Sequence, residues 1–186
     1  LEAGRRVYDQ RYDSSAFQYQ RSSTSLGARA GVALDLGEKL SGEFSAGWLR
    51  ERLDDDRLPT VGGPSINANL KWSPERGTNI GLTGTTTVES STTAGQSGDI
   101  LYSARLTGER QIRANLTGNA TLGLDWRDYM GSSDHDMVLS AEAGLTWWVN
   151  RYLGLTTRAR TEHQTSTIAG RAYVANSIFV GMKVQR

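Results

Sequence analysis

The stretch LTGNATLGLDWRDY, residues 116–129, carries an apolar or glycine side chain at nearly every second position. Polar side chains, among them Thr121, Asp125 and Arg127, occupy the positions between these apolar residues. Because side chains of a β-strand point alternately to opposite faces, this pattern predicts a strand with one apolar and one polar face. Such a strand fits either the sheet of a soluble domain or the wall of a membrane barrel.

The same alternation recurs along the chain. It is visible at 25–36, 40–48, 65–72, 79–89, 100–109, 137–149, 152–162 and 177–185, and a further strand-like stretch opens the chain at 1–8. We therefore predict about ten strands, joined as successive hairpins, in one all-β domain over residues 1–186.

The expected connections alternate in length. Short turns are expected at 37–39, 73–77, 110–113 and 149–151, and longer polar loops at 9–22, 50–63, 90–99, 130–136 and 163–172. Bacterial outer-membrane barrels combine short periplasmic turns with longer external loops. The rhythm predicts a transmembrane, antiparallel, up-and-down β-barrel with both chain ends on the periplasmic side.

Aromatic residues favour the membrane barrel over a soluble sheet. Trp48, Tyr102 and Trp126 fall beside expected long loops, whereas Trp72, Trp147 and Tyr152 fall beside short turns. Two aromatic belts at strand ends are typical of proteins that meet two membrane interfaces. We expect these six side chains to lie at the interfaces.

Charged residues share the polar parity of the strands. Seven are basic and seven acidic, namely Arg29, Lys71, Arg105, Arg127, Arg158, Arg160, Lys183, Asp35, Glu43, Glu89, Glu109, Asp125, Glu142 and Glu162. In a barrel of about ten strands they would line a neutral lumen little wider than one that side chains fill. We expect these charges to pair across the lumen; a closed, salt-bridged interior and a selective channel lining both stay open.

Composition excludes several classes of function. The chain of 186 residues has no cysteine, which rules out disulfides and thiolate chemistry. Its net charge of +1 and lack of a basic run give no reason to expect nucleic acid as a partner. Mean hydropathy is −0.48, and no apolar run is long enough for a membrane helix. The chain opens inside strand-like sequence, so we expect any signal peptide to have been removed or to lie outside it.

Two acidic motifs are candidates for catalysis or metal binding. In DHD, 134–136, a histidine between carboxylates has the pattern of a general base or a weak metal ligand, but no strained serine elbow accompanies it. ERLDDDR, 51–57, departs from the calcium-loop spacing and carries flanking arginines. We interpret both as solvated loops and expect no enzyme activity, no catalytic residue, no cofactor and no metal site.

The hairpin units at 26–48 and 139–166 resemble those of the beta-barrel porin type 2 family of Gram-negative bacteria. The stretch NSIFVGMKVQR, 176–186, is similar to terminal strands that the barrel-assembly machinery recognises. The resemblance implies a bacterial outer-membrane location within outer-membrane lipid. Because family members are usually longer on the N-terminal side, it also implies either that the chain is the C-terminal portion of a larger barrel or that its N-terminal side has been trimmed.

Three functions are compatible with these observations. The first is a pore or a component of an envelope export system, which the resemblance extends to exopolysaccharide secretion with export-system partners. The second is a structural or adhesive barrel with a closed lumen, acting through its external loops. The third is a soluble β-barrel that binds a small apolar ligand.

Overall fold

The computed structural model describes residues 1–9, 18–90 and 98–185, and these form one antiparallel sheet of ten strands. The strands are β1 (Glu2–Arg6), β2 (Ser23–Asp35), β3 (Leu40–Leu53), β4 (Val61–Trp72), β5 (Thr78–Ser90), β6 (Gly98–Arg113), β7 (Leu116–Tyr129), β8 (His135–Trp148), β9 (Leu153–Ser166) and β10 (Tyr173–Val184). No helix in the described ranges is long and apolar enough to span a membrane.

Each predicted strand is present, but several predicted connections are too long or misplaced. The turn expected at 110–113 lies at 114–115, because β6 continues to Arg113 through an irregularity after Gln111. The loop expected at 50–63 shrinks to 54–60, and β9 extends to Ser166. Polar residues at these ends still pair their backbones with the neighbouring strand, which a hydropathy pattern does not register. The loops predicted at 9–22 and 90–99 lie partly outside the described residues.

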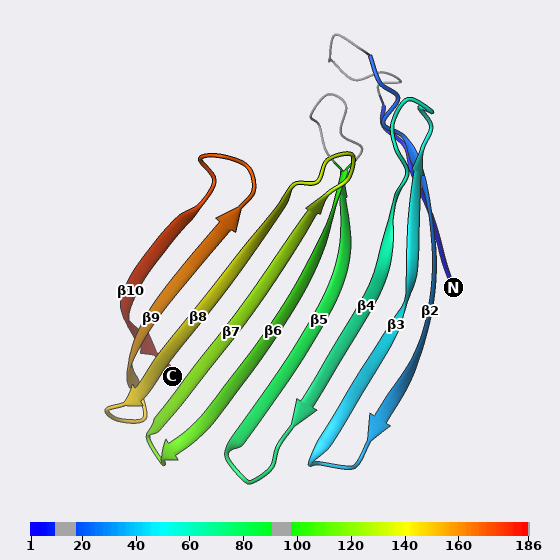
Figure 1. Ribbon diagram of the computed structural model, residues 1–186. Coiled ribbons are helices and arrows are strands. Elements are labelled where there is room, and N and C mark those ends of the chain that lie inside the picture. Colours follow the sequence, from blue (N-terminus) through cyan, green and yellow to red (C-terminus); the bar gives the residue numbers. More distant parts are fainter. Residues whose placement is uncertain (10–17, 91–97, 186) are drawn as a thin grey trace.

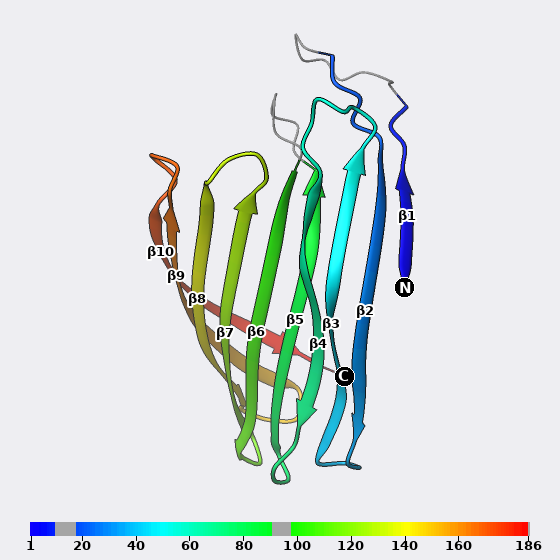
Figure 2. The same ribbon diagram turned by 45° about the vertical axis from the view of Figure 1, so that its right-hand side comes forward.

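The strands follow one another across the sheet in chain order. Figure 1 shows them side by side, with connections alternating between two ends of the sheet. We call the end with the short connections the turn end and the opposite end the loop end. Figure 2 shows that the sheet is strongly curved, with β9 and β10 bending behind its middle. Within the described residues β1 and β10 do not pair, so the predicted closure into a barrel is not found.

Register separates the two faces of the sheet. Leu82 lies opposite Leu106, which lies opposite Leu122, so these leucines of β5, β6 and β7 share one face. Glu142 lies opposite Arg160, on the other face. We call these the apolar face and the polar face. Most large side chains of the apolar face are exposed, among them Leu82 at 41%, Leu122 at 55% and Ile178 at 82%.

The described residues bury few hydrophobic side chains. The principal cluster is at the loop end, where Leu53, Leu58, Val61 and Ile100 pack together with Val88 and Tyr102 against them. A soluble sheet of this size normally covers its apolar face with a second layer. Here the middle of that face has no protein layer over it in the part of the chain that the structure describes.

Candidate functional site

All fourteen charged residues predicted from strand parity share the polar face. Glu43 lies opposite Asn69, and Asn69 opposite Thr83. Thr83 in turn lies opposite Arg105, so one row of the ladder links β3 to β6. The same reading of the register puts the other twelve on that face.

Only half of these charges form ion pairs within the described residues. The pairs join Arg29 to Glu2, Arg127 to Glu89, Arg158 to Glu142 and Arg160 to Glu162. The other seven form no ion pair within the described residues, and because the sheet does not close, their pairing across a lumen stays a prediction: Asp35, Glu43, Lys71, Arg105, Glu109, Asp125 and Lys183. The open sheet keeps distant strands apart, so a side chain meets only its neighbours. Arg105, for example, lies opposite Thr83 and Gly123, which carry no charge.

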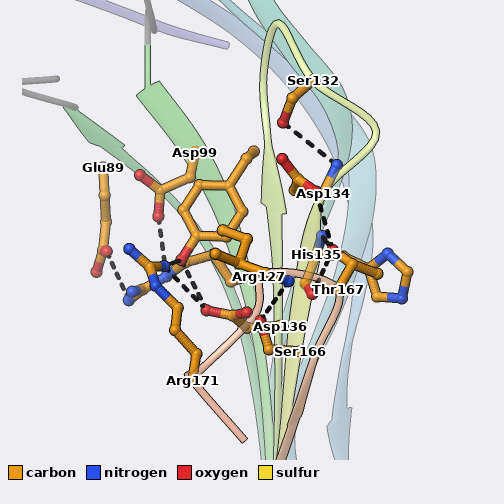
Figure 3. Close-up of polar contacts among 12 residues, drawn as sticks. Glu89, Asp99, Arg127, Ser132, Asp134, His135, Asp136, Ser166, Thr167 and Arg171 are labelled. Carbon is orange, nitrogen blue, oxygen red and sulfur yellow. Dashed lines mark hydrogen bonds and ion pairs between the residues drawn. The ribbon is translucent and has the colours of Figure 1, made fainter. Parts of the chain in front are cut away.

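At the loop end the polar face gathers a denser network, which we call the loop-end cluster: Glu89, Asp99, Arg127, Tyr129, Asp136 and Arg171. Its centre is Arg127 on β7 (Figure 3). One guanidinium nitrogen lies 2.9 Å from Glu89 Oε2 on β5, and Nε lies 2.9 Å from Asp99 Oδ2 on β6. The contact with Glu89 reaches across β6, which ties three strands together.

The other half of the cluster centres on Asp136. The Tyr129 hydroxyl donates to Asp136 Oδ2 at 2.7 Å, and Arg171 Nη1 lies 3.4 Å from the same oxygen. Arg171 also donates to the Tyr129 hydroxyl at 2.5 Å, so a residue of the β9–β10 connection closes the network. Three carboxylates and two guanidinium groups leave the cluster with a formal charge of −1.

Sequence reasoning found only part of this cluster. Glu89 and Arg127 were predicted on the polar face, whereas Asp99, Tyr129 and Arg171 were not singled out. Asp99 and Tyr129 continue the polar parity of their strands, so that signal was available in the sequence. The place of Arg171 in the cluster depends on the path of a connection, which alternation does not specify.

The DHD motif is split between the two faces. Asp136 belongs to the loop-end cluster, whereas the His135 ring stacks on Trp126, with ring centres 4.6 Å apart, on the apolar face. Figure 3 shows the imidazole pointing away from the carboxylates. Successive strand residues point oppositely, so this histidine cannot act together with Asp136. No group of three potential metal ligands occurs among residues 1–9, 18–90 and 98–185.

The acidic run at 54–56 is divided among three arginines. Asp54 pairs with Arg5 at 2.6 Å, and Asp56 pairs with Arg52 at 2.9 Å. Asp55 pairs with Arg57 at 2.6 Å and is buried. The Arg57 guanidinium, aided by backbone N–H groups, holds the pKa of Asp55 well below its usual range, against the opposing effect of burial. Neutralised by these partners, the run has little charge left for a cation.

Five of the six aromatic residues predicted at the membrane interfaces lie on the apolar face, and the sixth lies in a turn. Trp48, Tyr102, Trp126, Trp72 and Trp147 all lie on the apolar face, the first three towards the loop end and the last two towards the turn end. Tyr152 lies in the β8–β9 turn, where Arg151 stacks over its ring at 4.6 Å. Two levels of aromatic side chains therefore flank the aliphatic middle of the sheet.

Comparison with known proteins gives one result. No curated protein and no solved structure matches the chain. The family described as "Putative beta-barrel porin 2" matches it over residues 1–186. This agrees with the all-β sheet of antiparallel hairpins and with the family resemblance of its hairpin units. The chain belongs to this beta-barrel porin family.

Proposed function

We propose that this chain forms part or all of the wall of an outer-membrane pore, with its apolar face against lipid and its polar face lining an aqueous lumen. The observation that carries the proposal is the register. It puts fourteen charged side chains on one face and the exposed leucines, valines and tryptophans on the other.

The apolar face suits contact with acyl chains. Leu122 is 55% exposed and Val180 70% exposed, in an aliphatic band between the two aromatic levels. In water such a surface would cause aggregation, whereas in a bilayer its apolar side chains contact acyl chains without a hydration penalty. This supports the membrane barrel over a soluble barrel that binds a small apolar ligand.

The polar face suits contact with water. Glu43, Lys71 and Arg105 lie on central strands and form no ion pair within the described residues. A charge without a partner is strongly disfavoured in a dry interior but is tolerated where water solvates it. These side chains therefore favour a hydrated lumen, which requires the sheet to close on itself or on further strands in the membrane.

Planar-bilayer recording tests the proposal. The purified protein should give stable unitary current steps in salt solution. Arg105→Glu should shift the ion selectivity toward cations, because it exchanges a lumen cation for an anion. Arg76→Glu makes the same charge change in the exposed β4–β5 turn and should leave selectivity unaltered. Absence of unitary steps, or equal effects of the two variants, would contradict the pore.

A structural barrel with a closed lumen is the second candidate. It is supported by the ion pairs that Arg127, Arg158 and Arg160 make on the polar face. If these contacts fill the lumen, the protein acts through its external loops. Silence in the bilayer experiment, with correct insertion into outer membranes, would favour this candidate.

A role in envelope export is a narrower form of the pore hypothesis. The fourteen charges predicted from strand parity cancel, which suits passage of an uncharged hydrophilic chain better than that of an anion or a cation. Block of the ionic current by a neutral polysaccharide added to one side would support it. Passage of ions with no response to polysaccharide would leave a general pore.

A further inference from the structure

The loop-end half of β4 has parted from β5. β4 pairs with β3 along its whole length, up to Val61 opposite Glu51. With β5 it pairs from Trp72 only as far as Asn67, which lies opposite Thr85. β5 itself continues to Ser90 and remains paired with β6. Residues 61–66 therefore pair with the backbone of β3 on one side but not with that of β5 on the other.

Pro64 gives a physical reason for the parting. The Ile66 N–H donates to Thr86 Oγ1 at 2.9 Å, so the backbone nitrogen of residue 66 points towards β5. Backbone direction alternates along a strand, so the nitrogen of Pro64 faces the same way. Proline has no N–H to donate and is confined to edges and interruptions of sheets. Gly62 and Gly63 precede it and add no side chain to hold the strands together.

A cleft of about 230 Å³ lies where the strands separate. Its lining includes Arg29, Glu51 and Ser65 from the polar parity. Arg29 is fixed by Glu2 at 2.5 Å, and Glu51 by Arg6 at 2.9 Å. The lining also includes Trp48 and Val88 from the apolar parity. The cleft thus combines charged groups with residues of the face assigned to lipid.

Side-chain contacts replace the missing ladder. Leu53 and Val61, from the tips of β3 and β4, pack against Ile100 of β6 in the loop-end hydrophobic cluster. A Cβ at Gly63 would lie 3.0 Å from Ile100 Cδ1, so the β4 backbone rests closely on that side chain. Figure 2 shows this part of β4 crossing in front of β5. Apolar contacts can slide without breaking backbone hydrogen bonds, so the tips can separate at low cost.

We propose that the cleft between β4 and β5 is a lateral opening through which an amphipathic molecule with an acyl chain passes between the lumen and the surrounding bilayer. The polar head is recognised by Arg29 and Glu51, and the acyl chain lies against Trp48 and Val88. This inference rests on the proposed function, because a lateral opening needs both a lumen and a lipid-facing wall.

A disulfide across the cleft provides the test. Continuing the register beyond Asn67 and Thr85 puts Ser65 opposite Thr87, and both line the cleft. The chain has no cysteine, so Ser65→Cys with Thr87→Cys allows a single disulfide. Asn69→Cys with Thr83→Cys is the matched control, because it joins the same strands where the ladder already holds them. Pro64→Val, which restores a donor facing β5, is a variant without a cross-link.

Two readouts are taken on the same variants. Uptake of dansyl-undecanoic acid, a fluorescent fatty acid, is measured in Gram-negative cells that carry the protein in the outer membrane. Ion conductance is measured in planar bilayers. We expect the oxidised variant with cysteines at positions 65 and 87 to lower uptake to that of cells without the protein, with recovery on reduction. Pro64→Val should lower uptake in part. The control disulfide should leave uptake unchanged, and conductance should be equal throughout.

The outcomes separate the inference from the proposed function. Two outcomes overturn the lateral opening and leave the pore. The first is conductance without fatty-acid uptake by the unmodified protein. The second is uptake that persists when the disulfide between positions 65 and 87 has formed. Uptake that the disulfide stops, without conductance, supports the lateral route and contradicts an ion-conducting pore. Absence of both activities contradicts both.

Discussion

Arg127 stands between Glu89 and Asp99, within 2.9 Å of a carboxylate oxygen of each. It is the cation that holds two acidic strand ends together at the loop end of the polar face. If this face lines a pore, the cluster lies at the mouth, where its charge acts on every passing ion.

Removing that cation should change ion selectivity. Arg127→Gln takes the formal charge of the loop-end cluster from −1 to −2, so we expect the reversal potential in a salt gradient to move towards cation selectivity. The shift should be larger at low salt, because screening weakens the field of the cluster. Planar-bilayer recording measures both. Arg52→Gln removes an exposed arginine paired with Asp56 outside the cluster and should have no effect.

The assignment of faces predicts opposite outcomes for neighbouring residues of β7. Leu122→Arg puts a cation in the middle of the apolar face and should oppose membrane insertion by about 2 to 4 kcal/mol. Leu145→Arg on β8 should act in the same direction, with a smaller effect nearer an interface. Thr121→Arg, on the polar face opposite Glu142, should be tolerated. Folding into vesicles, followed by the heat-dependent gel shift, measures insertion. Equal damage from the two β7 variants would mean that the faces are wrongly assigned.

The sequence was sufficient for the strand pattern because alternation is local. Each strand has its own period of two, and the parity of Glu142 or Arg105 follows from its neighbours. Closure was not predictable in this way, since it depends on how β1 meets β10 across the whole sheet. The pairing of charges across the lumen stays open for a related reason: parity assigns Arg105 to a face but does not say whether a carboxylate lies near it.

The sequence contains a signal for the parting of β4 and β5. The Gly62-Gly63-Pro64 stretch contains a residue that a continuous ladder does not accept, and the structure places the parting of β4 and β5 there. Arg171 gave no such signal, because its contact with Asp136 requires the path of the β9–β10 connection.

Gly42 should be intolerant of a side chain. Its φ of +140° is a conformation that other residues rarely adopt, and a Cβ there would collide with the Asn69 carbonyl oxygen. We expect Gly42→Ala to lower the free energy of unfolding by roughly 1 to 3 kcal/mol, measured by urea titration in lipid vesicles. Gly108→Ala, on the same face with open space around the new methyl group, is the control and should have little effect. A stable Gly42→Ala protein would show that β3 and β4 adjust freely.

The loop at 54–60 should loosen in acid. Because the Arg57 guanidinium holds the pKa of Asp55 below its ordinary value of 3.8, the folded state favours the ionised carboxylate. Its contribution to stability is full above the unfolded pKa and is lost as pH falls below about 4 towards the folded value.

A nitroxide on Thr60→Cys, single in this cysteine-free chain, can report this change by its spectral mobility. We expect low mobility at pH 7 that persists near pH 3, where the folded carboxylate is still ionised, and higher mobility only at lower pH. Asp55→Asn should give high mobility at both pH values, because it removes the ionised partner of Arg57. Asp56→Asn alters an exposed pair with Arg52 and should behave like the parent. A label that remained immobile in Asp55→Asn would mean that the apolar contacts of Leu58 and Val61 hold the loop without the Asp55 carboxylate.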